Sequence, residues 1–389
     1  MSLYVYNISN NQEFMYEKTL KEITAINKLN QKKLKINLIK TTEHLSAMFT
    51  DSDAVLIFLG ETSEYHRDII RKCNNHSIPV IITQTSPTIF PDCSFSTIIS
   101  DAYDTIFKIV SHYNSANLNR FCIFTFNPNC MSDKNYVTSL WQCVPNFTTN
   151  DIFGTHDTFQ TEFDYFFEKR NQYDVIICPN DIIAIKLIHE IKNRDPEYLK
   201  NHYIVGFMNS ILAKLYSTTI TSFAYDTNDL VQAIYVIYKT LKKNNTAISS
   251  MNVQLHNKIF IGETWGDFEQ KNEFNPSFRS NESFIIPNNC KSLDYSKDSA
   301  LNMLIKIEQL LLKLNLFELE ILYWILCDET INKISQILYS NPQTIHYHLN
   351  KMYSALNINT KNDFINILTP YIESDNLLTY IKKLKNSRQ

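Results

Sequence analysis

The first two-thirds of the chain alternate short apolar runs with longer amphipathic stretches. The apolar runs are nearly continuous, as expected for strands buried on both faces of a parallel sheet. We predict strands at Leu3–Ile8, Lys35–Ile39, Ala54–Leu59, Val80–Thr83, Phe95–Ile99, Arg120–Phe126, Val175–Cys178 and Tyr203–Phe207. We predict helices at Glu13–Asn27, Tyr65–Asn75, Ala102–Asn114, Asp133–Gln142, Phe159–Arg170, Asp181–Lys192 and Asn228–Lys243. This alternation predicts an α/β fold with a doubly wound parallel sheet.

The pattern changes near residue 297. Residues 266–297 are rich in asparagine, serine and charge and contain two prolines, which is typical of a linker. Beyond them the periodicity is helical only. The sequence therefore predicts an α/β domain over 1–265, a linker over 266–297 and a small all-α domain over 298–389.

Three segments of the first domain carry a resemblance to a known family. They read YDVIICPNDIIAIKLI, YIVGFMNSILAKLYSTTITSFAYDTNDLVQAI and KIFIGETW. Their order and spacing resemble the ligand-binding core of the LacI family, which is similar to type I periplasmic sugar-binding proteins. The resemblance covers about residues 1–265 and implies two lobes, joined by three crossover strands, that close on a small molecule. In the first segment, Asp181 is predicted to cap the following helix.

The family's ligand positions carry over to this sequence in part. Asn180 matches a family asparagine and would offer an amide to a ligand hydroxyl. Phe14 falls near an aromatic that stacks on ligand and Tyr225 near a hinge glutamine, with core packing as the alternative for both. Met208 replaces an aspartate and Ser132 an arginine, which removes two groups that would hold a pyranose. The effector is left open between a sugar-like molecule and another metabolite.

Residues 316–358 have the pattern of a helix-turn-helix. Thr330 is a good N-cap for a first short helix, and Asn341-Pro342 is a strong start for a second. In the second helix, apolar residues recur at helical spacing at Ile345, Leu349, Met352 and Leu356. Two short helices joined by a tight turn form this motif.

The same stretch resembles the LuxR-type (GerE-like) DNA-binding domain. The family's Glu-x-Glu-Val-Leu appears as Glu318–Leu322, its Thr-Val-Lys-x-His as Thr344–His348, and its closing motif as Met352–Ile358. Ala355 replaces a family lysine and Asp328 a family glycine. The resemblance implies that the second helix lies in the major groove of double-stranded DNA.

The apolar spacing of the second helix leaves a polar face pointing outward. Glutamine and asparagine can read adenine edges, while threonine, tyrosine and lysine can hold phosphates. The candidate DNA-binding residues are therefore Gln343, Thr344, His346, Tyr347, Asn350 and Lys351, with Lys333 from the first helix. We interpret His348 as a packed or structural histidine.

Charge is the weak point of a DNA-binding interpretation. The whole chain has a net charge of -3. Between Leu301 and Thr360, lysines are slightly outnumbered by acids, although phosphate neutralisation supplies most non-specific affinity. The C-terminal IKKLKNSRQ either adds charge for DNA or is a solvated tail. A homodimer, which the LacI resemblance also implies, would double the available charge.

An apolar seam precedes the helix-turn-helix. It consists of Leu301, Leu304, Ile307, Leu311 and Leu314. The seam either packs in a dimer or covers the adjacent helices of its own chain.

Composition excludes several classes of protein. Hydrophobic residues make up 44% and aromatics 13%, enough for ordinary cores. The eight cysteines show no CxxC spacing, so we expect reduced thiols and no metal site. With five glycines and no phosphate loop, no catalytic triad and no paired carboxylates, we expect neither a cofactor nor an enzyme. Because a signal peptide and a membrane-length apolar run are lacking, we expect a cytoplasmic protein.

Two hypotheses of function follow. The first is a transcription regulator in which a small-molecule effector, bound between the lobes, controls a C-terminal DNA-binding helix-turn-helix. The alternative is a sensor or adaptor whose helix-turn-helix binds a protein, for which the acidic balance would be the reason. A salt-dependent shift of random duplex DNA would separate the two.

Overall fold

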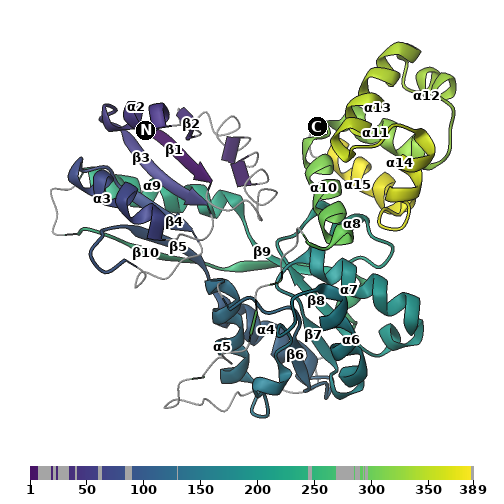
Figure 1. The fold of residues 1–389 in the computed structure, drawn as a ribbon, viewed down its shortest axis with the longest axis horizontal. Helices are drawn as coiled ribbons and strands as arrows, with labels where there is room; N and C mark the ends of the chain where they lie inside the picture. Colours follow the sequence, from purple (N-terminus) through teal and green to yellow (C-terminus); the bar gives the residue numbers. More distant parts are fainter. Residues whose placement is uncertain are drawn as a thin grey trace.

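The computed structural model describes residues 1–7, 19–20, 23–24, 35–39, 42–59, 64–83, 90–128, 130–243, 248–268, 284, 290–291, 293 and 297–386. Over these residues the chain forms two α/β lobes and a C-terminal helical domain (Figure 1). Lobe 1 and the C-terminal domain both lie above lobe 2 in that view. Among the described helices, none has the length and apolar character needed to cross a membrane.

Lobe 1 is built on a six-stranded sheet with the order β10-β5-β4-β3-β1-β2, in which every pairing is parallel. All six residues of β3 are buried, as a strand covered on both faces requires. The strands are β1 (Ser2–Asn7), β2 (Lys35–Ile39), β3 (Ala54–Leu59), β4 (Val80–Thr83), β5 (Ser96–Ser100) and β10 (Asn252–Leu255). The helices are α2 (Thr42–Phe49), α3 (Glu64–Asn75) and α9 (Thr227–Lys243).

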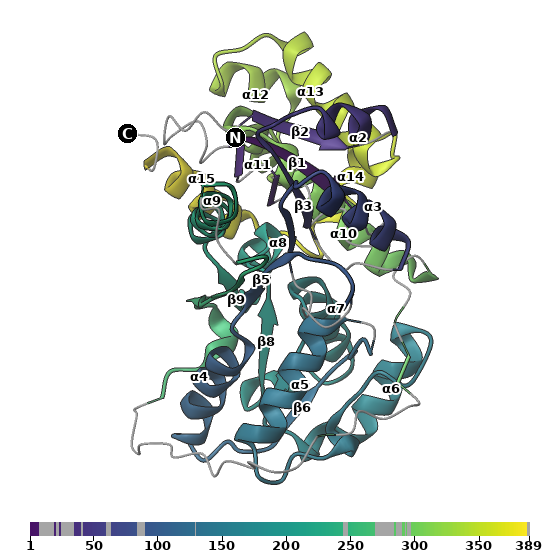
Figure 2. The same cartoon turned by 90° about the vertical axis from the view of Figure 1, so that its left-hand side faces the viewer.

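Lobe 2 has a five-stranded sheet with the order β11-β9-β8-β7-β6, parallel except for the edge strand β11. The strands are β6 (Phe121–Ile123), β7 (Val175–Ile177), β8 (Tyr203–Phe207), β9 (Thr221–Tyr225) and β11 (Asn257–Phe260). The α-helices are α4 (Ala102–Asn114), α5 (Met131–Cys143), α6 (Phe159–Lys169), α7 (Asp181–Arg194) and α8 (Ile211–Leu215). Short 3₁₀ turns lie at Thr149–Asp151, Arg170–Gln172, Pro196–Lys200 and Glu263–Trp265. Figure 2 shows lobe 2 with α4, α5 and α6 beside its strands.

Three segments cross between the lobes: the chain after β5, the chain after β9, and the chain that leads from β10 into β11. Asn257, on the last crossing, ties the segments together. Its Nδ2 donates to Ser100 Oγ at 2.8 Å and to Thr105 Oγ1 at 3.0 Å, and its backbone lies opposite Tyr225 of the second crossing. The two lobes and three crossings implied by the LacI resemblance are therefore present.

The C-terminal domain is all-helical. Its helices are α10 (Ser299–Lys313), α11 (Leu316–Leu326), α12 (Ile331–Ile337), α13 (Pro342–Leu356), α14 (Lys361–Leu368) and α15 (Ser374–Asn386). The predicted caps are confirmed: Thr330 Oγ1 accepts from the N–H of Lys333, and Asn341 Oδ1 accepts from the N–H of Thr344.

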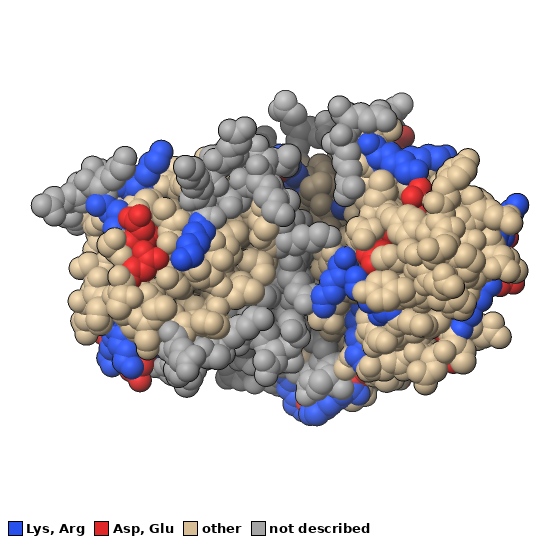
Figure 3. Space-filling model, turned by 90° about the horizontal axis from the view of Figure 1, so that it is seen from above, with Lys and Arg blue, Asp and Glu red and all other residues tan. Residues whose placement is uncertain are grey.

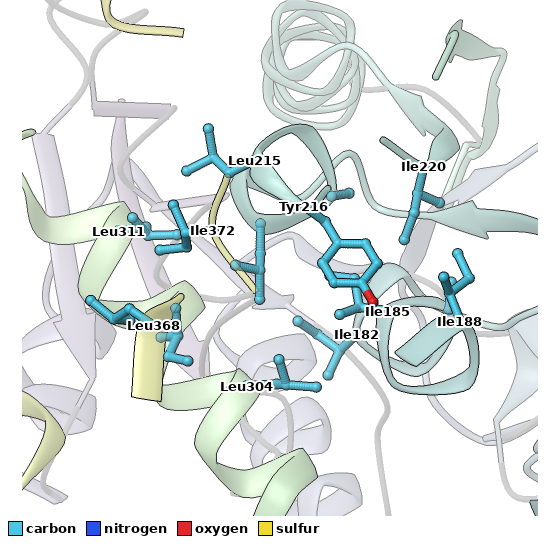
Figure 4. Packing of buried hydrophobic residues seen from close by; sticks show 14 of the residues in the cluster. Ile182, Ile185, Ile188, Leu215, Tyr216, Ile220, Leu304, Leu311, Leu368 and Ile372 are labelled. Atoms are coloured by element: carbon cyan, nitrogen blue, oxygen red, sulfur yellow. The ribbon is translucent and has the colours of Figure 1, made fainter. Parts of the chain in front are cut away.

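The C-terminal domain shares one hydrophobic core with lobe 2. Helix α10 packs on α7 and α8, and α15 packs on α8. In Figure 4, Leu304 and Leu311 of α10 lie beside Ile182 of α7 and Leu215 of α8. The apolar seam that includes Leu304 is therefore buried within its own chain, and its alternative assignment to a dimer interface is wrong.

One other prediction about this region needs correction. Up to residue 386 the basic end of the chain is helical and not frayed, because Lys382, Lys383 and Lys385 lie on α15, whose Leu377 and Ile381 are buried. Within the predicted linker, two of the described residues contact lobe 2. Leu293 belongs to the shared core, and the N–H of Lys291 donates to the carbonyl of Gly154 at 2.7 Å.

The predicted fold class is confirmed, with differences in detail. Helices α2 and α8 and strand β10 were not predicted because they are short. Strand β10 also lies at a sheet edge, where its residues alternate between exposed and more buried positions. The strand predicted at Arg120–Phe126 reduces to β6, because the chain turns at Thr125, where φ is 61°. Most of the helix predicted at Glu13–Asn27 lies outside the described residues.

Candidate functional site

Four of the five predicted ligand residues follow neighbouring strands of lobe 2 at the same edge of its sheet. Asn180 follows β7, Met208 follows β8, Tyr225 ends β9, and Ser132 lies in the first turn of α5, after β6. Parallel strands end at a common edge, and ligands of α/β sheets bind there. The fifth, Phe14, lies outside the described residues.

At the end of β7, the roles of two neighbouring residues differ from prediction. Asn180, not Asp181, is the N-cap of α7, because its Oδ1 accepts from the N–H of Ile183 at 3.0 Å. Asp181 is fully buried, and its carboxylate accepts from the N–H of Ser210 and the hydroxyl of Ser222, both at 2.7 Å. The capping prediction for Asp181 is therefore wrong: its carboxylate fastens the loop after β8.

That loop has an unusual backbone. Met208 and Asn209 have φ of 100° and 51°, in the left-handed region that side chains rarely adopt. The N–H of Met208 donates to the carbonyl of Phe223 at 2.9 Å, and the N–H of Asn209 donates to Ser222 Oγ at 2.8 Å. These bonds, together with that of Ser210 to Asp181, hold the strained conformation at the sheet edge.

The other two predicted ligand residues are half-buried. Ser132 Oγ lies 2.9 Å from the Sγ of Cys130, which is the residue before α5. The ring of Tyr225 packs against the core of lobe 1, at a crossing. The nearby acid Asp133 is buried and accepts the N–H of Asn127 at 3.0 Å. Asp133 and Asp181 are both buried and bind groups of the protein itself. This edge therefore presents amide, hydroxyl and thioether groups, which suit a neutral polar ligand.

The second candidate site is the outer face of α12 and α13, the two helices over which the sequence predicts a helix-turn-helix. In α13 the residues Ile345, Leu349, Met352 and Leu356 are buried, as predicted. The predicted contact residues Gln343, His346, Tyr347, Asn350 and Lys351 are exposed, Lys333 of α12 is exposed, and Thr344 is half-buried.

A buried carboxylate ties α13 to α11. Glu318 Oε2 accepts the N–H of Asn315 in a capping box, and Glu318 Oε1 lies 3.0 Å from both His348 Nδ1 and Lys351 Nζ. Burial alone would raise the pKa of Glu318, but the Asn315 N–H, Lys351 and His348 outweigh it and lower that pKa. His348 therefore has the structural position that the sequence indicated, while Lys351 combines this ion pair with an exposed side chain.

Three described residues of the domain other than glycine lie in the left-handed region, Asp328, Tyr339 and Asn357. Asp328, at the end of α11, has φ of 58°. Tyr339, in the turn between α12 and α13, has φ of 49°, and 98% of its surface is exposed. Tyr347 on α13 is 68% exposed. Sequence periodicity treated Tyr339 as part of a break between helices and gave no sign of its exposure.

Most of the acidic residues of this region are either buried or paired with a lysine of the same chain. Glu308 and Glu318 are buried, Asp328 pairs with Lys361 at 2.7 Å, and Glu320 pairs with Lys385. On the described surface visible from above in Figure 3, basic and acidic side chains are interspersed and form no single basic patch. The exposed face of α13 is thus neither acidic nor strongly basic.

Several solved structures with a similar fold are described as transcription regulators or repressors. The transcriptional regulator CelR in complex with cellobiose has a TM-score of 0.53 at 10% identity, covering 68% of this chain and 84% of that one. The Lac repressor bound to ONPG has a TM-score of 0.52 at 12% identity, covering 68% and 82%. CcpA of Lactococcus lactis has a TM-score of 0.51 at 12% identity, covering 68% and 99%.

These likenesses define the class of fold. The two lobes have the architecture of LacI-type, periplasmic-binding-protein-like sensor domains, and identities this low show the fold alone. The matched share equals that of residues 1–265 in the 389-residue chain. No protein-family model matches this sequence, and no curated protein matches it.

Proposed function

We propose that this protein is a transcription regulator that binds double-stranded DNA through its C-terminal helix-turn-helix and responds to a small molecule held between its sensor lobes. The observation that carries the proposal is the two-sided character of α13. One side of the helix is fully packed, while Gln343, His346, Tyr347 and Asn350 on the other side are exposed. A polar helix face of this kind fits a major groove.

Two exposed tyrosines add to this face. Buried packing does not account for Tyr339, because nearly all of its surface faces solvent, and its left-handed backbone costs about 1–2 kcal/mol. The left-handed residue ends α12, where the N–H of Ser340 donates to the carbonyl of Ser335 at 2.9 Å, a position that usually holds glycine or asparagine. The fold therefore needs this backbone conformation but not an exposed tyrosine, and that choice of residue is a sign of function. We assign Tyr339 and Tyr347 to contacts with the DNA backbone, where tyrosine hydroxyls commonly bind phosphate.

Few cations lie on this face, so the proposal predicts a shallow salt dependence. Lys333 is exposed, and Lys351 is partly neutralised by Glu318. The logarithm of the affinity for duplex falls against the logarithm of the salt concentration with a slope of about −0.9 per neutralised phosphate. We therefore expect a slope of roughly −2 for each C-terminal domain that binds. A random-sequence duplex pool, measured by fluorescence anisotropy from low to physiological salt, gives this slope directly.

Substitutions then locate the interface. Tyr347→Ala should weaken duplex binding by roughly tenfold, whereas Tyr165→Ala, at an exposed tyrosine of lobe 2, should leave it unchanged. Tyr339→Asn should raise stability, because asparagine tolerates the left-handed region, and yet lower DNA affinity. If the intact chain binds no duplex at low salt, the DNA-binding proposal fails and the protein-adaptor alternative takes its place.

The sensor part of the proposal is a binding function, without catalysis. The regulators with a similar fold hold cellobiose and ONPG, and the edge of lobe 2 presents uncharged polar groups. We propose a neutral hydroxylated metabolite, and a calorimetric panel of cellobiose, pentoses and nucleosides tests it. Asn180→Ser keeps a helix cap but removes the amide, so it should weaken binding by roughly tenfold, unlike Asn193→Ser at the exposed end of α7.

A further inference from the structure

The five-residue helix α8 lies between the two candidate sites. It begins directly after the strained Met208-Asn209 segment of the ligand-facing edge, and it packs on α10 and α15 of the C-terminal domain. An isolated helix this short is unstable in water, because its nucleus costs more than so few hydrogen bonds return. Its conformation must therefore be fixed by its surroundings, which are the core around the buried side chains of Leu212 and Leu215 and the groups that bind its two ends.

The N–H groups at the start of α8 are divided between two parts of the molecule. Lobe 2 binds two of them: Asp181 accepts from Ser210, and Ser210 Oγ accepts from Ala213. The C-terminal domain binds the two between them, because Glu308 Oε1 and Oε2 of α10 accept from the N–H groups of Ile211 and Leu212, at 2.9 and 2.8 Å.

The other end of α8 is also held by the C-terminal domain. The N–H of Glu373 donates to the carbonyl of Leu215 at 2.7 Å, and Asn376 Nδ2 donates to the carbonyl of Tyr216 at 2.8 Å. These two residues lie at the start of α15. The C-terminal domain therefore binds both ends of α8, while lobe 2 shares the first of them.

We propose that α8 is the coupling element between the ligand-facing edge and the helix-turn-helix, and that Glu308 is the positioning residue that makes the connection. This inference rests on the proposed function for the roles of the two ends. A shift of the Met208-Asn209 segment displaces Ser210, and the displacement passes through α8 to the buried carboxylate of Glu308 on α10. Helix α10 in turn packs on α13, so the DNA-facing helix moves with it.

Coupling of this kind is reciprocal, which gives a test that needs neither ligand nor DNA. Hydrogen exchange is measured by mass spectrometry on the full chain. Glu308→Gln should speed exchange about tenfold or more in peptides spanning residues 205–216, including the Met208-Asn209 segment. Asp181→Asn, made in lobe 2, should in turn speed exchange in α10 and α13.

Two further variants guard the interpretation. Glu320→Gln neutralises an acid of α11 that pairs with Lys385 of the same domain, and it should leave exchange in residues 205–216 unchanged. If Glu308→Gln does not fold, Asn376→Ala takes its place. It removes one half-buried contact at the far end of α8 and should speed exchange in the same peptides to a smaller extent. The proposal is overturned if the effect of Glu308→Gln stops short of Met208, or if Asp181→Asn leaves α10 and α13 unchanged.

Failure of this inference is distinguishable from failure of the proposed function. If hydrogen exchange is coupled across α8 but the chain binds no duplex, the coupling proposal stands and the DNA-binding proposal fails. Duplex binding without coupled exchange would keep the DNA-binding role and overturn α8 as its link.

Discussion

The two lobes share an architecture but differ in what covers their helices. In lobe 1, α3 has the sequence EYHRDIIRKCNN, with one apolar side and a charged side that bears Arg67 and Arg71. In lobe 2, all residues of α7 from Asp181 to Ile188 are buried. An amphipathic helix covers one neighbour, whereas a helix that is apolar on all sides needs a second. For α7 that second neighbour is α10 of the C-terminal domain.

This difference divides the molecule into unequal mechanical units. The core of lobe 2 continues into the C-terminal domain, while among the described residues the two hydrophobic clusters of lobe 1 include none from that domain. Lobe 1 is joined to lobe 2 by the three crossings. We therefore expect opening and closing to move lobe 1 against a larger body formed by lobe 2 and the C-terminal domain, within which α8 links the two parts.

The largest expected effect comes from the shared core. Leu304→Ala removes a fully buried side chain of α10 at this junction and should cost about 2–5 kcal/mol of unfolding free energy. Because the core is shared, lobe 2 and the C-terminal domain should lose stability together in denaturation followed by hydrogen exchange. Leu56→Ala, at an equally buried residue in β3 of lobe 1, should lower the stability of lobe 1 alone. A Leu304→Ala chain in which lobe 2 keeps its full stability would break the comparison.

A smaller effect is expected at Glu318, which ties α11 to α13. Glu318→Gln should cost about 1–3 kcal/mol at neutral pH, because it removes a buried charge that binds His348 and Lys351. The folded pKa of Glu318 is lowered from 4.5, so its stabilisation is present above that pH and is lost as pH falls through the folded pKa.

Urea titrations of the two proteins at neutral and acid pH check this sign. The difference in unfolding free energy between wild type and Glu318→Gln should become smaller as the pH is lowered. The control Glu320→Gln, in a partly exposed pair with Lys385, should cost about 0–1 kcal/mol. A gap that widens in acid would contradict the assignment.

The crossings offer a test of comparable or smaller size. Asn257→Ala leaves the hydroxyls of Ser100 and Thr105 without their amide partner and should cost about 1–2 kcal/mol. The change should appear as faster exchange at the crossings and as a broader range of lobe separations in small-angle scattering. The junction between α8 and α10 should keep its protection, since it lies within the other body.

The smallest effect is expected at Asp328, in a turn of the C-terminal domain. Asp328→Gly relieves a left-handed residue but gives up an exposed ion pair with Lys361. The net change should lie within about 1 kcal/mol and favour stability. Thermal unfolding measures it, and a clear loss of stability would show that the pair with Lys361 matters more than the backbone.

Local chemistry in the sequence decided the parts of the structure that depend on neighbours along the chain. The caps at Thr330 and Asn341, the buried face of α13 and the sequence of parallel strands all follow from spacing and side-chain type. The order of strands after Tyr173, with an asparagine and a methionine just past two strand ends, also placed Asn180 and Met208 at one edge. The caps and the buried face could be predicted because each needs only residues within a few turns of one another, and the shared edge because parallel strands end on the same side of a sheet.

Tertiary structure decided what depends on residues far apart in the chain. No local pattern shows that Asp181 holds Ser210 and Ser222, or that Glu308 reaches back 97 positions to Ile211. The sequence left the apolar seam of α10 open between a dimer and its own chain, since a hydrophobic stripe does not specify its partner. Folding selected the partner by burying that stripe on α7 and α8, and a carboxylate in the same helix became a connection between two domains.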